Sequence, residues 1–115
     1  MKTKVIKSKH FPFKGFIALC LWPFVFVRKD SEGKYGATAD NHERIHAEQQ
    51  KEMLVLPFLL WYGLEWLIKL FAYRNAKDAY MNISLEREAY ENMANLSYIE
   101  NRRRYGWIKL IIRRV

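Results

Sequence analysis

Two of the three histidines in this chain, His42 and His46, are four residues apart, with Glu43 directly after the first. On a helix, residues i and i+4 leave the same face, so both imidazoles can converge on one ion. Neutral imidazole is a good zinc ligand, and a catalytic zinc site has three protein ligands with a fourth position left for water. The Glu43 carboxylate lies at the edge of that face, where it can take a proton from the activated water and return it to a leaving amine. The spacing therefore predicts a zinc hydrolase site that needs one more ligand.

The alternative is a pair of surface histidines beside a salt-bridging glutamate, because this five-residue pattern also arises by chance. The third histidine, His10, lies in a lysine-rich segment and is expected to be exposed. A third ligand elsewhere in the chain shifts the balance toward a metal site.

The helix that must carry the histidines is predicted over residues 39–56, a segment rich in helix formers that contains no Gly or Pro. Thr38 or Asp40 can cap its start, and Asp40 with Glu43 matches the spacing of a capping box. Pro57 either kinks this helix or opens the next one, since proline is tolerated in a first helical turn.

Two apolar segments flank that helix. Residues 15–27 are short and rich in β-branched and aromatic side chains, which favours a buried strand that Pro23 divides in two, and the polar residues 28–37 predict a loop. Residues 53–72 match the length of a membrane span, but Glu65 and Lys69 lie on one helix face, where they can pair. Such charges are costly in a span, so the hydrophobic centre of a small fold, or a helix in the membrane interface, is favoured over a true span.

A last long helix is predicted from Asp78 or Ser84, either of which can cap it, to residue 103. Its core face is expected to hold Leu85, Ala89, Leu96 and Ile99. The whole chain, residues 1–115, is thus expected to form one α+β domain, mainly helical, with three helices and a short N-terminal strand pair.

The formal charge of +8 is concentrated at the two ends. Residues 1–14 carry five lysines and residues 101–115 six basic side chains, with no acid in either, which leaves the middle with a net charge of −3. This suits an anionic membrane surface better than a nucleic-acid groove, although the charges can also simply solvate the termini. Cys20 is the single cysteine, so a reducing compartment and a cytoplasmic location are expected, with peripheral or integral membrane attachment as an addition.

The chain resembles the zincin metallopeptidases, and most closely their glutamate branch, in which the histidine motif is followed by a second helix with a liganding glutamate. Residues 42–46 (HERIH) are similar to the first half of this pattern, and residues 86–90 (EREAY) to the second. Peptidases of the HtpX type and the CAAX-prenyl-protease type have Glu-x-x-Ala-Asp there, and membrane association is common among them. A group of small bacterial zincin-like proteins is also similar.

The resemblance implies a zincin-like fold, a zinc cofactor and Glu86 as the third ligand. Glu88 competes for that role, but the Glu-x-x-Ala register favours Glu86 because it turns Glu86 and the small Ala89 toward the first helix. Glu88 would then be solvated or paired with Arg87 or a lysine. Tyr90 stands where the family has an Asp that orients a histidine, and its hydroxyl can accept the same hydrogen bond.

Such a hydrolase also needs a donor for the developing oxyanion. Tyr90 is the first candidate, among the tyrosines Tyr62, Tyr73, Tyr80 and Tyr90.

Three functions follow. The first is a zinc-dependent, peptidase-like metallohydrolase at or near a membrane surface, acting on a peptide or protein, with a partner protein as one source of a substrate cleft. The second is a catalytically silent zincin-like module that binds zinc, a protein or a membrane. The third is a small basic protein at a membrane interface or on nucleic acid, in which the histidine motif is accidental.

Overall fold

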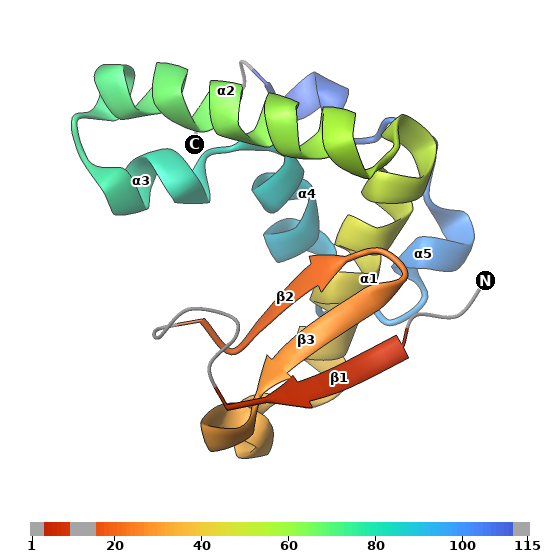
Figure 1. The fold of residues 1–115 in the computed structure, drawn as a ribbon. Helices are drawn as coiled ribbons and strands as arrows, with labels where there is room; N and C mark the ends of the chain where they lie inside the picture. The colour runs from red at the N-terminus through yellow and green to blue at the C-terminus, as the bar shows by residue number, and fades with distance from the viewer. Residues whose placement is uncertain (1–3, 10–15, 112–115) are drawn as a thin grey trace.

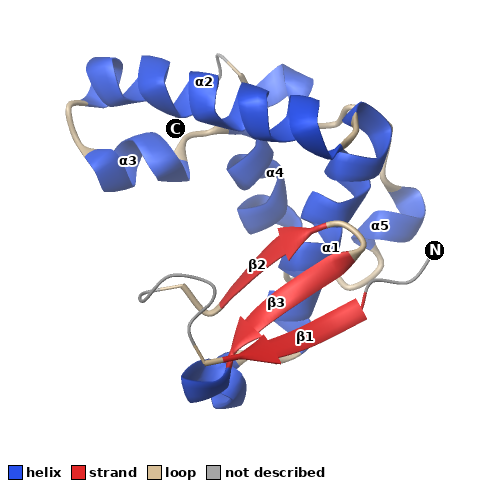
Figure 2. Cartoon of the chain, in the orientation of Figure 1, coloured by secondary structure: helices blue, strands red, loops and turns tan. Residues whose placement is uncertain are grey.

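The computed structural model describes residues 4–9 and 16–111 and confirms the α+β class (Figures 1 and 2). A small sheet lies against the first helix, and the other helices cover the far side and one end of that helix (Figure 1). The described elements, in chain order, are β1 (Lys4–Ser8), β2 (Ala18–Leu21), β3 (Phe24–Arg28), η1 (Lys29–Lys34), α1 (Ala37–Met53), α2 (Val55–Tyr73), α3 (Ala76–Met81), α4 (Ser84–Asn92), α5 (Tyr98–Asn101) and η2 (Ile108–Leu110).

The sheet has the order β1-β3-β2, so β2 lies at one edge. Strands β2 and β3 are the two halves predicted on either side of Pro23, and they pair antiparallel with Cys20 opposite Val25. β1, in the basic N-terminal segment, pairs parallel to β3 and was not predicted. Its sequence KVIKS gives no clear strand signal because it has only two large apolar residues, and both Val5 and Ile6 are partly exposed.

Helix α1 begins at Ala37 after Gly36, without a side-chain cap. The predicted caps are therefore wrong: Thr38 and Asp40 lie inside the helix, and the Asp40 carboxylate accepts a hydrogen bond of 2.6 Å from the Tyr35 hydroxyl. The segment expected as a loop contains the short helix η1.

Helix α2 follows a sharp reversal at Leu54, whose φ is 67°. Pro57 lies in its first turn, so the proline opens a new helix, which was one of the two alternatives. α2 is the one helix in the described part of the chain that is long and apolar enough to cross a membrane. It is not the buried centre of the fold, because only Phe58 and Glu65 in it are fully buried.

The predicted last helix is broken into α3, α4 and α5, which corrects the count of three helices. Asn75 caps α3 by accepting from the Asp78 backbone N–H, whereas Asp78 and Ser84 cap nothing with their side chains. The turns fall at asparagines, whose side chains compete with helical hydrogen bonds. Leu85 and Ala89 are buried as expected, but Leu96 lies in the turn between α4 and α5 and is 60% exposed.

Candidate metal centre

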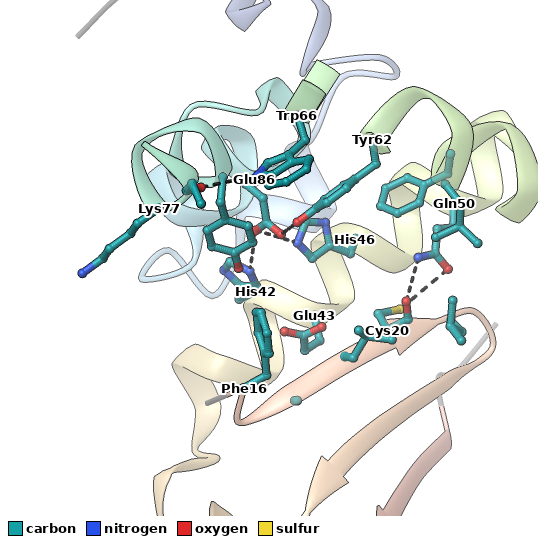
Figure 3. Close-up of a pocket in the computed structure, with 17 residues that line it drawn as sticks. Phe16, Cys20, His42, Glu43, His46, Gln50, Tyr62, Trp66, Lys77 and Glu86 are labelled. Atoms are coloured by element: carbon teal, nitrogen blue, oxygen red, sulfur yellow. Dashed lines mark hydrogen bonds and ion pairs between the residues drawn. The ribbon is translucent and has the colours of Figure 1, made fainter. Parts of the chain in front are cut away.

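Three buried side chains from two helices meet where α1 crosses α4 (Figure 3). The Nε2 atoms of His42 and His46 lie 3.2 and 3.1 Å from the same carboxylate oxygen, Oε1 of Glu86. All three ligand atoms lie within 4.8 Å of one another. Two imidazoles and a carboxylate form a donor set that could bind a metal ion, although the same atoms also form ion pairs with each other.

Asn41, just before the histidines, fixes how the two helices meet. Its side-chain amide donates to the backbone carbonyls of Met93 and Asn95, at 2.8 and 3.0 Å, where α4 has ended. The last carbonyls of a helix have no partner within the helix, so this one amide both closes the end of α4 and ties it to α1. The spacing between His42 and Glu86 is thereby held by contacts outside the cluster.

Gln49 sets the tautomer of His46. The Gln49 amide nitrogen donates to the carbonyl of Leu85 and to Glu88, so its oxygen must face Nδ1 of His46, 2.8 Å away. An amide oxygen only accepts, and Nδ1 therefore carries a proton. In the neutral ring this leaves the lone pair on Nε2, which faces Glu86 and is available to a metal.

His42 is held differently. Its Nδ1 is buried without a hydrogen-bond partner among the described residues. The ring of Tyr90 packs against the His42 ring, with centroids 4.4 Å apart, while the Tyr90 hydroxyl lies 3.2 Å from the Tyr80 hydroxyl. The expected hydrogen bond from a histidine to Tyr90 is thus replaced by a ring contact.

The structure brings Glu86, and not Glu88, to the histidines. Glu88 points to another part of the interior, where Arg102 donates to both of its oxygens, at 2.7 and 2.9 Å. The expectation that Glu88 is solvated or paired with Arg87 is therefore wrong, because its side chain is 1% exposed and its partner is Arg102. Arg87 instead pairs with Glu91.

The charges in the cluster shift its pKa values. Burial alone would lower the pKa of His46, but the carboxylate of Glu86 outweighs it and raises this pKa from 6.5 to about 9. The pKa of Glu86 is lowered, because the nearby histidines outweigh the effect of burial. The pKa of Glu43 is raised by burial, an effect that the two histidines only partly offset.

Glu43 faces a cavity of about 590 Å³ next to the cluster. The wall of the cavity is mostly apolar and comes from β2, α1, α2, α3 and α4, as Figure 3 shows. His42, His46 and Glu86 all line the same space, so a molecule in it can reach the cluster and Glu43 together. Cys20 also lines it, but burial raises the pKa of its thiol to about 12, which keeps it protonated and a poor nucleophile.

The tyrosines divide into separate roles. The Tyr62 hydroxyl donates to Oε2 of Glu86 at 2.5 Å and so orients the carboxylate. Tyr80 lines the cavity, whereas Tyr90, the first candidate for an oxyanion donor, lies behind Tyr80 and outside the cavity wall. Its catalytic role stays a prediction.

Sequence reasoning missed Gln49 and Asn41, and it named Tyr62 only as a candidate oxyanion donor rather than as a partner of Glu86. Gln49 could have been found, because it follows His46 by three residues and a side chain at that spacing can reach the ring. The contact of Tyr62 with Glu86 could not have been found, since only the tertiary fold brings the two together. His10 lies outside the described residues.

No family model, curated protein or solved structure matches this chain. The resemblance to the zincins therefore stays a prediction.

Proposed function

We propose that this chain is a metal-dependent hydrolase that uses zinc and cleaves peptide bonds. The observation that carries the proposal is the position of Glu43, a buried carboxylate that lines the same cavity as the two Nε2 atoms and Glu86. A structural ion-pair cluster needs neither an adjacent cavity nor a second carboxylate beside it.

The donor set suits zinc. His42 and His46 would supply nitrogen and Glu86 oxygen, and three protein ligands leave a coordination position open toward the cavity. When bound, zinc would act as a Lewis acid that polarises a substrate carbonyl and acidifies water.

The remaining chemistry falls to residues of the chain. Glu43 is the base that accepts a proton from water on its carboxylate and returns it to the leaving amine, and its raised pKa favours the first transfer. Tyr80 is the better-placed donor to a carbonyl oxygen, because its hydroxyl lies beside the cavity and contacts that of Tyr90.

The edge strand β2 supports a peptide as the substrate. The Arg28 N–H donates to the Ile17 carbonyl, so by the alternation of an antiparallel pair the backbone groups of Ala18 and Cys20 face away from β3. The Gln50 side-chain amide donates a hydrogen bond to the carbonyl of Cys20. The N–H and C=O of Ala18 and the N–H of Cys20 can therefore form hydrogen bonds with an extended peptide, which would add to the edge of the sheet as a further strand.

A catalytically silent module is the second candidate. The direct contacts from both histidines to Glu86 favour it, since a protonated His46 can hold the cluster together without metal. Either function is compatible with a cytoplasmic location, which the single, free and buried Cys20 supports.

The test begins with the metal content of the purified protein by mass spectrometry. Stoichiometric zinc is expected in the wild type and in Glu91→Gln, a control on the same helix, and it should be lost in His46→Ala and Glu86→Gln. Glu43→Gln should keep the zinc but lose cleavage of a mixed library of quenched fluorescent peptides. No zinc in the wild type would contradict the proposal, and zinc without any Glu43-dependent cleavage would favour the silent module.

A further inference from the structure

Every exposed residue of helix α2 is apolar. The large exposed side chains follow one another at helical spacing, and Phe71 is 81% exposed while Leu56 and Leu60 are each 66% exposed. The complete set of exposed positions in Val55–Tyr73 is Leu56, Pro57, Leu59, Leu60, Gly63, Leu64, Leu67, Ile68, Phe71 and Ala72. Leu54, just before the helix, extends this surface, which we call the leucine face.

The charged groups of α2 lie on its other side. Glu65 is buried and accepts hydrogen bonds from the Ser84 backbone N–H at 2.7 Å, the Ser84 hydroxyl at 2.5 Å and Trp61 at 3.0 Å. Lys69 pairs with Glu65 at 2.6 Å and also donates to the Asn82 carbonyl. A helix on the surface of a water-soluble protein has the opposite order, with its charges outward and its leucines inward.

The leucine face is too large and uniform to be ordinary water-exposed surface. Soluble monomers rarely leave contiguous apolar patches of more than a few hundred Å² in water, and such patches mark interaction sites. The core of a protein interface is apolar, but its rim is polar. No exposed position of α2 offers a polar group, which leaves a hydrocarbon layer as the better match.

Basic side chains lie at both ends of the leucine face. Arg74 and Lys77 are exposed after the end of α2, and before its start lie the exposed Arg104 and the partly exposed Lys51, of which Lys51 pairs with Glu48. Cations at the borders of an apolar face complement anionic lipid headgroups.

α2 cannot cross the bilayer in this fold. Helix α3 packs beside its second half and exposes Lys77 and Asp78, which a crossing would bring into the hydrocarbon (Figure 1). From these observations we infer that α2 lies in the plane of a lipid bilayer, with the leucine face among the acyl chains and the rest of the protein in water.

This position has a consequence for the candidate site, and this step rests on the proposed function. Leu59 belongs to both the leucine face and the wall of the cavity, so the cavity opens beside the lipid. The substrate is then a peptide segment held at the membrane surface.

Flotation of the full chain with vesicles tests the inference. The vesicles are phosphatidylcholine with phosphatidylglycerol, and the variants are the double variant Leu56→Asp, Leu64→Asp and the control Leu96→Asp, which places the same change at an exposed leucine outside α2. The wild type and the control should float, and the double variant should lose binding by at least about tenfold, since each aspartate must enter the hydrocarbon boundary. Circular dichroism should show unchanged folding, because both leucines lie at the surface.

Two results would overturn the inference. The wild type could fail to float, or the double variant could float as well as the control. In the second case, loss of flotation in high salt would assign membrane binding to the basic ends of the chain. A concentration-dependent dimer that the double variant abolishes, without flotation, would assign the leucine face to a second copy of the chain. Zinc content, measured on the same samples, separates this test from that of the proposed function. A wild type without zinc would refute the proposed function and would leave flotation unaffected.

Discussion

Glu86 and Glu88 are two residues apart on α4, both are buried, and their surroundings differ in one decisive respect. Glu88 has a permanent cation, Arg102, which also makes two hydrogen bonds to Glu52, at 3.0 and 2.8 Å. The guanidinium forms a closed group with two carboxylates, and the Tyr98 hydroxyl adds a further donor to Glu88. Among the residues that the structure describes, Glu86 faces only two histidines and a hydroxyl, and its group opens on a cavity.

The difference indicates which group is structural and which can exchange its cation. An arginine stays charged at every accessible pH, so Glu88 keeps its cation without anything from solution. The Glu86 group is neutralised only by a proton or a metal ion, each of which can come and go. Gln49 joins the two groups, since its nitrogen donates to Glu88 and its oxygen accepts from His46.

The largest expected effect comes from Arg102→Met, which removes the permanent cation. It leaves Glu52 and Glu88 buried without compensation and should reduce the free energy of unfolding by about 3–5 kcal/mol. Urea denaturation measures the loss. Arg103→Met, at the exposed neighbouring residue, is the control, and an equal small effect of both changes would show that the Glu88 group is not structural.

Zinc separates the two glutamates. At about a thousandfold excess over its dissociation constant, zinc should raise the free energy of unfolding of the wild type by about 4 kcal/mol. Glu88→Gln should retain this increment from a lower starting stability, whereas Glu86→Gln should lose it. Thermal unfolding with zinc and with a chelator gives both values, and an increment that survives in Glu86→Gln would remove this residue from the ligand set.

Gln49→Leu tests the bridge between the groups. Without the amide oxygen, Nδ1 of His46 is no longer fixed as a donor, and zinc affinity should fall roughly 10–100-fold, as for other residues that orient metal ligands. Gln50→Leu is the control because Gln50 contacts only β2 and its turn among the described hydrogen bonds. Zinc titration with a competing chelator reports the affinity, and equal affinities in the two variants would argue against the bridge.

The sequence predicts the parts of the site that depend on local periodicity. His42 and His46 share a face because any helix places i and i+4 together, and the division of the N-terminal apolar segment follows from Pro23. The Glu65–Lys69 pair is confirmed for the same reason, with its nitrogen and oxygen 2.6 Å apart. These expectations needed only the helix or strand repeat.

Tertiary contacts decide the rest. The burial of Glu88 depends on Arg102, which belongs to the basic C-terminal segment that was expected to contact a membrane surface or solvent. The end of α4 depends on Asn41, a residue of α1 whose amide reaches across the fold to the Met93 carbonyl. The exposure of the α2 leucines could not be predicted from the sequence either, because the periodicity of a helix does not say which of its faces packs against the protein.

The smallest expected effect is the pH dependence of the metal-free protein. The pKa of His46 is raised from 6.5 to about 9 in the folded chain. Between these two pH values the folded chain therefore keeps the His46 proton, whereas the unfolded chain releases it. The stabilisation is therefore complete below 6.5 and is lost as the pH rises through about 9, at about 1 kcal/mol between roughly pH 7 and pH 8. Urea unfolding in chelator across this range should show the decline in the wild type and in Glu88→Gln, but not in Glu86→Gln. With saturating zinc the trend should reverse, because the metal requires the neutral imidazole, so a decline that persists with zinc would mean that the ion binds elsewhere.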